Sequence, residues 1–478
     1  MNKLLIMLVF GALLSACSGI RSVPYPTHFE TLDKNAVNFI REVPPVNLNN
    51  YAPQQNRASQ LMQDRDILVS ISGGGARAAA FTLGVLAELE NLGQWTELKN
   101  TNNALLEIDY FSTVSGGGWG ASAYLADVVQ LNSSSYSLNT RLPVIERKFL
   151  DFSEDNDSCL SRGIEKNITT GVTLGDINAK HGEHVSIPYL FVNTTIESNQ
   201  SPFVVSREHV KYYRVDHFYA CGDDIKYEVS DDVDSLPVSY AVATSGSVPG
   251  FHYSSASTTI CSDQKLSLSS FCSKGKNDLS QLILIDGGLY DNYGFQTALE
   301  ILNSAPKDHT KTLIVIDTNA DTEIPFTNDR ERWNIGVGIS SLKKAGFPSK
   351  TSSFNRLFNL TAQSMGIKPL VLDFYSAVLS EDELQKVKDL GMLNGLDLLS
   401  AHAANQTNCF AEDGTYLDDV SERQEFRSED CILNNYYRSG LIGKTTYKFD
   451  DYYFTLLEQL GKFVVRVNAQ KIYAALYE

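Results

Sequence analysis

The sequence predicts an α/β fold, with a central, mostly parallel sheet that is flanked by helices. Short apolar runs alternate with helical patterns, because the runs at 67–71 and 108–114 are each followed by apolar residues at helical spacing. Such alternation is typical of a parallel sheet that is covered on both faces by its crossover helices. Three later runs, at 187–192, 282–285 and 313–316, are continuously apolar, as buried central strands are.

Composition places the chain among ordinary globular proteins with an acidic charge balance. Of its 478 residues 43% are hydrophobic, so a sizeable core can form. The length allows two or three domains, or one large α/β domain with an appendage. Because 57 acidic residues outnumber 40 basic ones, the net charge is −17 and no basic field is available for nucleic acid, which we do not expect as a partner.

The N-terminus has the features of a secretion signal. Lys3 precedes an apolar stretch at residues 4–14 that is shorter than the ~20 residues a membrane-spanning helix needs. The following Leu14-Ser15-Ala16-Cys17 resembles the lipobox of bacterial lipoproteins, which implies cleavage before Cys17 and attachment to a membrane surface through a lipid anchor on its sulfur. Ser18, rather than Asp, after the anchor implies the outer membrane, on either its periplasmic or its surface face. The alternative is an ordinary signal peptide with an unrelated cysteine.

Six cysteines remain after Cys17, and an even number in an exported chain favours disulfides. They are Cys159, Cys221, Cys261, Cys272, Cys409 and Cys431. Because short loops close at lower entropic cost, we favour pairing the third with the fourth and the fifth with the sixth, which leaves the first two for each other. The alternative is a set of six unpaired thiols.

Three turns that contain glycine follow three of the predicted strands. The first, Gly73-Gly74-Gly75-Ala76-Arg77, opens a helix. Consecutive glycines let the backbone approach closely, so their amides can converge with the helix N-terminus on one anionic oxygen. The spacing fits neither a dinucleotide-binding turn nor a Walker loop, although a phosphate remains as plausible a ligand as an oxyanion.

The second and third turns offer a nucleophile and a base. Ser115 lies in the sharp strand-to-helix turn of residues 112–119, where three glycines make room for a strained backbone. Asp286 follows the apolar run at 282–285 and precedes two glycines, so a partly desolvated carboxylate reaches the end of a strand. Taken singly, each has a simpler interpretation, as an N-capping serine and as a turn aspartate.

In this order the three turns resemble the patatin-like phospholipase family, which has a glycine-rich oxyanion loop with Arg, a Gly-x-Ser-x-Gly elbow and an Asp-Gly-Gly turn. Residues 241–250 are also similar to the family's Ala/Ser-rich helix that ends at a proline. The resemblance covers roughly residues 67–320 and implies a patatin-like fold. The chain then divides into four segments: signal peptide 1–16, tether and packing arm 17–65, catalytic domain 66–325, and a helical C-terminal extension 326–478.

The resemblance implies a lipid acyl hydrolase of the cell envelope, of the phospholipase A or lysophospholipase type. In the implied Ser-Asp dyad, Ser115 is the nucleophile and Asp286 is the general base. The amides of Gly73 to Gly75 form the oxyanion hole, and Arg77 positions the loop. Membrane lipid is the implied substrate, and the chemistry requires neither a metal nor another cofactor. Head-group preference and protein partners cannot be read from the sequence.

Three positions depart from the family pattern. Ser72 replaces Asp before the glycines, Ala78 replaces Gly after Arg77, and Thr113 replaces the first Gly of the elbow. The first two change side chains beside the loop and leave its amides in place. Thr113 is β-branched where crowding favours Gly, and Gly118 is the residue that could offset the crowding. Thr113 keeps open an alternative function, a catalytically weak lipid-binding or scaffolding outer-membrane lipoprotein that retains the fold.

Residues 332–372 contain no acidic side chain, although the protein as a whole is acidic. Interspersed with aromatic and aliphatic residues are six basic ones: Arg332, Lys343, Lys344, Lys350, Arg356 and Lys368. This composition suits an interfacial lid on a bilayer surface. The other interpretation, a loop and helix whose charges balance acidic neighbours in space, is equally open.

Overall fold

The fold was obtained as a computed structural model. It describes residues 64–96, 103–155, 159–180, 187–197, 200–213, 215–221, 225–229, 233–248, 256–261, 279–318, 361–377, 385–387, 389–396 and 451–477. The signal peptide, Cys17 and the tether up to residue 63 lie outside these residues, as do residues 332–360 of the acid-free segment.

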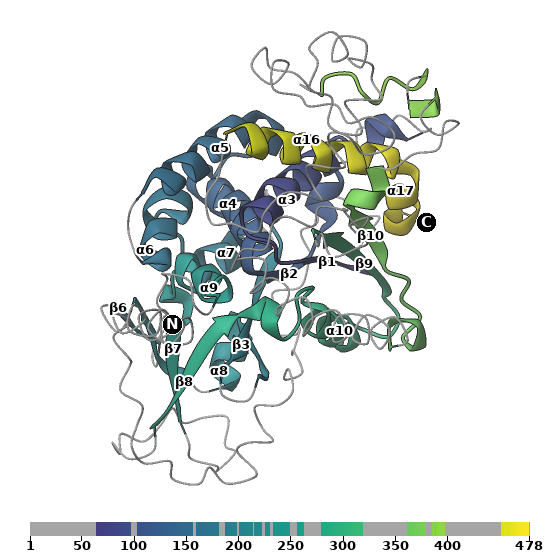
Figure 1. The fold of residues 1–478 in the computed structure, drawn as a ribbon. Coiled ribbons are helices and arrows are strands. Elements are labelled where there is room, and N and C mark those ends of the chain that lie inside the picture. Colours follow the sequence, from purple (N-terminus) through teal and green to yellow (C-terminus); the bar gives the residue numbers. More distant parts are fainter. Residues whose placement is uncertain are drawn as a thin grey trace, which may run out of the picture.

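Among the described residues, a mixed sheet of ten strands forms the centre of the fold (Figure 1). Its parallel part contains five neighbouring strands, which are β10 (Leu370–Asp373), β9 (Thr310–Asp317), β1 (Arg65–Ile71), β2 (Tyr110–Val114) and β3 (Tyr189–Ile196). Four of the five apolar runs predicted as strands fall on these elements, and the α/β fold with a parallel centre is confirmed. Apolar side chains dominate here because both faces of the strands are buried.

Beyond β3 the sheet becomes antiparallel. The order continues through β8 (Leu279–Asp286), β7 (Ala256–Cys261), β5 (Val215–Ala220) and β6 (Ile225–Glu228). The remaining strand, β4 (Pro202–Val205), also pairs with β3 in the antiparallel direction. The fifth predicted run therefore lies on β8, which is antiparallel to its neighbours rather than part of the parallel centre.

Helices cover both faces of the sheet (Figure 1). On one face, α3 (Ala76–Leu89) and α4 (Ser115–Leu131) pack against alternate residues of β1, including Ile67 and Val69. On the other face, α10 (Phe295–Ser304) belongs to a second apolar cluster that contains Leu68 of β1. Successive strand residues point to opposite faces, so β1 contributes to both cores.

The C-terminal extension joins the same core. The helical character predicted for this extension is present in α16 (Asp451–Val467) and α17 (Ala469–Tyr477), and α16 packs along α3. The two backbones touch where Gly84 meets α16, because a Cβ on Gly84 would lie 1.9 Å from the carbonyl oxygen of Glu458. A buried ion pair between Arg466 and Glu88, with Nε and Oε1 2.8 Å apart, fastens the same two helices.

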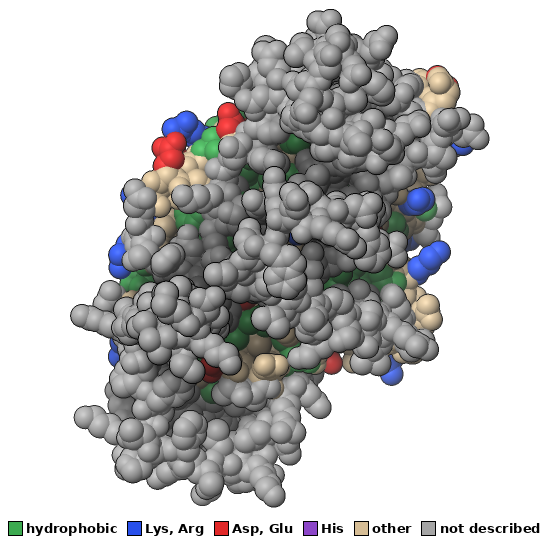
Figure 2. Space-filling model, in the orientation of Figure 1, with side chains coloured by type: hydrophobic (Ala, Val, Ile, Leu, Met, Phe, Trp, Pro, Cys, Tyr) green, Lys and Arg blue, Asp and Glu red, His purple; other side chains and the backbone are tan. Residues whose placement is uncertain are grey.

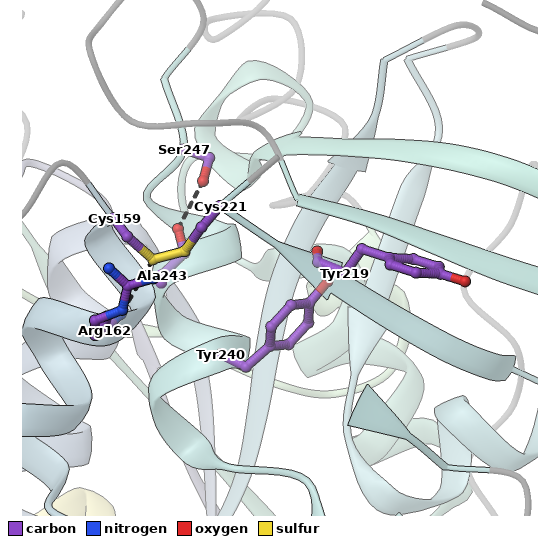
Figure 3. Close-up of a disulfide and its surroundings, with 7 residues drawn as sticks. All are labelled: Cys159, Arg162, Tyr219, Cys221, Tyr240, Ala243 and Ser247. Atoms are coloured by element: carbon purple, nitrogen blue, oxygen red, sulfur yellow. Dashed lines mark hydrogen bonds between the residues drawn. A yellow bond between two sulfur atoms is a disulfide. The ribbon is translucent and has the colours of Figure 1, made fainter. Parts of the chain in front are cut away.

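A disulfide joins Cys159 and Cys221, the pair that sequence proximity leaves over (Figure 3). It links the residue before α6 (Leu160–Ile164) to the residue after β5. In the close-up the disulfide lies beside the C-terminal part of α9 (Val238–Ser245), near Ala243. The antiparallel part of the sheet is thus cross-linked to the helical layer. The two other proposed pairs are not tested, because Cys272, Cys409 and Cys431 lie outside the described residues.

Figure 2 shows side chains of the described residues on one face of the molecule. On the face in Figure 2, Lys and Arg side chains lie at the margins, and hydrophobic side chains are visible nearer the middle. Among the helices that the structure describes, none combines the length and the apolar character needed to cross a membrane.

Candidate active site

The carboxyl ends of β2 and β8 meet along one edge of β3. Val114, the last residue of β2, is aligned with Asn193, and Asp286, the last residue of β8, is aligned with Thr194. Both strands lie on the edge of β3 opposite β4, so they face each other end to end. The antiparallel direction of β8 is therefore what brings Asp286 to the end of β2.

This arrangement places Ser115 and Asp286 in direct contact. The hydroxyl of Ser115 donates a hydrogen bond to Oδ2 of Asp286 at 2.8 Å. The other carboxylate oxygen, Oδ1, accepts the N–H of Gly288 at 2.7 Å, which fixes the orientation of the carboxylate. Both side chains are buried, with Ser115 7% and Asp286 6% exposed. The structure thus brings the expected nucleophile and the expected base to hydrogen-bonding distance.

The backbone of Ser115 is left-handed, with φ of 48°. A non-glycine residue in this region is strained, which is typical of a nucleophile on a sharp strand-to-helix turn. The glycines that follow are required by the loop packed against the turn. A Cβ on Gly116 would lie 2.0 Å from the carbonyl oxygen of Gly75, and one on Gly117 would lie 2.4 Å from that of Ser72.

Two helices begin at this site without a cap from their own N-cap residues. Helix α3 begins after Gly75 and α4 begins at Ser115, and neither has an N-cap side-chain hydrogen bond or an acidic residue in its first turn. Of the first amides of α4, that of Ser115 is accepted by the hydroxyl of Ser245. The first N–H groups of a helix have no partner within the helix, and the helix dipole adds positive potential there. Both starts can therefore stabilise a negative charge that develops beside Ser115.

At helix α10, by contrast, a carboxylate, Asp291, accepts an N–H of the first turn and the N–H groups of the two residues before the helix. Oδ1 of Asp291 accepts the N–H groups of Tyr293 and Gly294, each at 3.0 Å, and Oδ2 accepts that of Gln296 at 2.9 Å. Burial raises the pKa of Asp291 to about 6, against the opposite effect of these backbone hydrogen bonds. The loop between Asp286 and α10 is held by this buried carboxyl.

The glycine loop differs in one respect from the expected oxyanion hole. The N–H of Gly73 donates to the carbonyl oxygen of Asn292 at 3.0 Å, so this amide is engaged within the protein. Among the described residues, no acceptor lies within hydrogen-bonding range of the N–H groups of Gly74 and Gly75. The structure therefore leaves two of the three expected amides available to an oxyanion.

The residues that depart from the family pattern have identifiable contacts. The hydroxyl of Ser72 accepts the N–H of Thr318 at 2.7 Å, which ties the glycine loop to the end of β9. Thr113 is fully buried and its hydroxyl donates to the carbonyl oxygen of Phe191 at 3.3 Å. A Cβ on Gly118 would lie 3.1 Å from that hydroxyl, so Gly118 makes room for the β-branched side chain.

Arg77 lies beside the glycine loop rather than pointing into solvent. It occupies the first turn of α3, is 6% exposed, and its guanidinium carbon lies 5.9 Å from the centre of the Phe374 ring. One of its terminal nitrogens would be 3.5 Å from a Cβ on Gly74, which places the side chain against the loop.

Sequence reasoning missed two buried residues behind the dyad, Ser245 and Asn193. The hydroxyl of Ser245 accepts the N–H of Ser115 at 2.7 Å and donates to the carbonyl oxygen of Asn193 at 2.5 Å. Weak signals for both exist in the chain. Ser245 lies in the Ala/Ser-rich segment 241–250, and Asn193 is a polar residue directly after the apolar run 187–192.

The geometry defines an α/β protein with a serine on a nucleophile elbow, a neighbouring carboxylate and two open helix N-termini. The sequence model of the patatin-like phospholipase family matches residues 69–299, a range that includes all three turns. The chain therefore carries a patatin-like phospholipase domain. No curated protein matches the chain.

Solved structures of human GIVD cytosolic phospholipase A2 are similar to this chain at 12% sequence identity. One match covers 88% of this chain and 61% of that one, with a TM-score of 0.44. The complex with methyl gamma-linolenyl fluorophosphonate matches with a TM-score of 0.42 and covers 91% of this chain and 64% of that one. The chain thus spans less than two thirds of the length of these structures.

Proposed function

We propose that this protein is a lipid acyl hydrolase of the phospholipase A or lysophospholipase type, which cleaves carboxylic esters with a Ser-Asp dyad. The match to the patatin-like phospholipase family supports the class of lipid hydrolase. The observation that carries the mechanism is the 2.8 Å hydrogen bond from the hydroxyl of Ser115 to Oδ2 of Asp286.

In the first half of the reaction, Ser115 Oγ attacks the ester carbonyl carbon while Oδ2 of Asp286 takes the hydroxyl proton. The carbonyl oxygen becomes an oxyanion, which the amides of Gly74 and Gly75 and the N-terminus of α4 stabilise. Collapse of this intermediate breaks the bond to the leaving alcohol, and the proton held by Asp286 passes to that alcohol. The acyl group remains on Ser115.

In the second half, water replaces the alcohol. Asp286 takes a proton from the water as its oxygen attacks the acyl carbonyl carbon, and the same amides hold the second oxyanion. Release of the fatty acid returns the proton to Oγ of Ser115. The cycle uses only groups of this chain, the ester and water.

The available contacts support this function over a catalytically weak lipid-binding protein. Thr113, which kept the second function open, is accommodated by Gly118 without displacing Ser115 from Asp286. Release of fatty acid from phosphatidylethanolamine vesicles and from lysophospholipid micelles tests the proposal, with Ser115→Ala as the inactive control. Equal release by wild type and Ser115→Ala would exclude the dyad as the source of activity.

We also propose that the protein is a lipoprotein of the outer membrane, anchored through Cys17. The support is the lipobox-like sequence that ends at Cys17 and the serine that follows it. Cys17→Ser should move the protein from the membrane fraction to the soluble fraction, since a diacylated cysteine supplies the attachment. Mass spectrometry showing an unmodified Cys17 in the mature protein would contradict the anchor.

A further inference from the structure

The amide of the proposed nucleophile is held by a buried hydroxyl from another element. The hydroxyl of Ser245, the last residue of α9, accepts the N–H of Ser115 at 2.7 Å. The same hydroxyl donates a hydrogen bond to the carbonyl oxygen of Asn193 at 2.5 Å. Ser245 is fully buried and Asn193 is 6% exposed. Water therefore does not compete for these two hydrogen bonds in the folded protein.

Asn193 is itself fixed by its side chain. Its Nδ2 donates to the carbonyl oxygen of Thr113 at 2.9 Å and to the hydroxyl of Ser112 at 3.0 Å. Its Oδ1 accepts the hydroxyl of Thr297 at 2.5 Å. The carbonyl oxygen that receives Ser245 thus belongs to a residue clamped between β2 and α10 and cannot shift without breaking several buried hydrogen bonds.

The same residue also borders the turn that carries the base. A Cβ on Gly287 would lie 2.1 Å from the carbonyl oxygen of Asn193, so the Asp286 turn packs directly on that peptide. Through Ser245 and Asn193, the backbone of Ser115 is therefore positioned relative to β3, the strand with which Asp286 is also paired. A movement at Ser245 changes the separation between the two ends of the dyad.

The backbone conformation of Ser115 explains why the hydrogen bond from its N–H to Ser245 is needed. Its φ of 48° is unfavourable for a side chain with a Cβ, and its N–H lies in the buried interior. Without the Ser245 hydroxyl, this N–H would lose its partner, and the peptide would gain by rotating toward another acceptor. Rotation of the peptide would carry Oγ away from Asp286.

We propose that Ser245 is a positioning residue, which acts through Asn193 to hold the backbone of Ser115 in its left-handed, reaction-ready conformation. The inference rests on the proposed function, because it concerns the geometry of the same dyad. The hydroxyl of Ser245 contacts the backbone N–H of Ser115 and not its reacting hydroxyl, which donates to Asp286. Its contribution therefore falls on the rate of the chemical step and leaves substrate binding unchanged.

The test compares Ser245→Ala with Ser122→Ala, on hydrolysis of 4-nitrophenyl butyrate. Ser122 is an equally buried serine on α4 whose hydroxyl donates only to the carbonyl oxygen of Trp119, at 3.0 Å. Ser245→Ala should lower kcat about 10- to 100-fold with KM within about twofold, since small misplacements of a reacting group cost up to about 100-fold. Ser122→Ala should keep kcat within about twofold.

Labelling by a fluorophosphonate gives a second readout that an effect on stability alone does not produce. Ser245→Ala should reach the same final stoichiometry as the wild type at a rate lowered by the same factor as kcat. If Ser245→Ala does not fold, Ser245→Cys replaces it, because the thiol keeps the volume and accepts hydrogen bonds only weakly. A kcat for Ser245→Cys equal to that of the wild type would then overturn the proposal.

The failures of the two proposals are distinguishable. Retained hydrolysis in Ser115→Ala removes the dyad and the positioning role together. Loss of hydrolysis in Ser115→Ala, with Ser245→Ala behaving as Ser122→Ala does, removes only the positioning role. A rise in KM at unchanged kcat in Ser245→Ala would also overturn it, because that result indicates a role in substrate binding.

Discussion

The parallel and antiparallel parts of the sheet supply different halves of the proposed chemistry. In the parallel part, β1 and β2 each end in a glycine turn that opens a helix, so these strands deliver the amides of the loop and Ser115. In the antiparallel part, β8 ends in a turn that opens a 3-10 helix, residues 287–289, and delivers Asp286. The two parts meet at β3, and the dyad spans the junction.

The difference shows what each architecture contributes. A parallel strand followed by a helix places an uncapped helix N-terminus at the end of the strand, where it favours negative charge. The antiparallel strand β8 is followed by a short 3-10 helix whose Gly288 N–H is capped by Asp286 itself, and its carboxylate meets the nucleophile end to end along β3. The base beside the N-termini of α3 and α4 thus comes from a strand whose own following helix is capped.

The largest expected effect comes from cutting the contact between the two parts. Ser115→Ala and Asp286→Asn should each lower kcat/KM for ester hydrolysis by about four orders of magnitude, and the double variant should be little worse. The residues act as one unit, so their losses do not add. Steady-state kinetics on 4-nitrophenyl butyrate measures the effect, with thermal melting to verify folding. Full activity in either single variant would refute the dyad.

A second prediction weakens the antiparallel part alone. The Cys159–Cys221 disulfide closes a loop with a sequence separation of 62, for which the chain-entropy model gives about 4 kcal/mol of stability. The double variant Cys159→Ala, Cys221→Ala should lower the free energy of unfolding by about 2–4 kcal/mol, measured in urea. In the native state kcat should stay within about twofold. An unchanged urea midpoint, or the same midpoint for wild type with and without reductant, would argue against a stabilising disulfide.

A third prediction concerns the buried carboxyl after β8. Because the pKa of Asp291 is raised to about 6, the native state binds a proton more tightly than the unfolded chain, whose Asp has a pKa near 4. The stabilisation that this proton contributes is therefore complete below about pH 4 and is lost as the pH rises through about 6. The free energy of unfolding should fall by about 3 kcal/mol over this range.

The matched variant is Asp291→Asn, which stays neutral and still presents an oxygen to the backbone amides. The stability of wild type relative to this variant should fall between pH 4.5 and pH 7, measured by urea unfolding at each pH. Parallel pH profiles for the two proteins would show that Asp291 does not titrate with a raised pKa.

The smallest expected effect lies inside the parallel part, at the contact between Thr113 and Gly118. In a helix, Gly→Ala normally stabilises by up to about 1 kcal/mol. The 3.1 Å approach to the Thr113 hydroxyl should cancel this gain in Gly118→Ala, and Thr113→Ala should restore it. A double-mutant cycle should give a coupling of about 1 kcal/mol, whereas additive effects would mean that Gly118 does not compensate for Thr113.

The parallel part of the sheet could be predicted from the sequence, whereas most of the antiparallel part could not. Continuous apolar runs on β1, β2, β3 and β9 were sufficient to predict the parallel centre, because both faces of those strands are buried. The antiparallel strands β5 and β6 have mixed sequences such as Val215–Ala220 and Ile225–Glu228, in which no apolar run stands out. The direction of β8 could not be predicted, because a run of apolar residues looks the same in a parallel and in an antiparallel strand.

The same limit applies to the site. Ser115 and Asp286 could be proposed because each lies in a local glycine turn whose chemistry is visible in a few residues. The roles of Ser245 and of the Gly73 amide depend on contacts across the chain, and Ser245 is 130 residues from its partner Ser115. No local sequence pattern indicates such a contact, so only the folded structure reveals it.

Covalent labelling tests the central claim, that Ser115 is a nucleophile activated by Asp286, most directly. Incubation with a fluorophosphonate followed by peptide mass spectrometry should find one adduct per chain, on the peptide that contains Ser115. Asp286→Asn should form the same adduct far more slowly, and Ser115→Ala should form none. An adduct on a different serine, or continued ester hydrolysis with Ser115 unlabelled, would contradict the account.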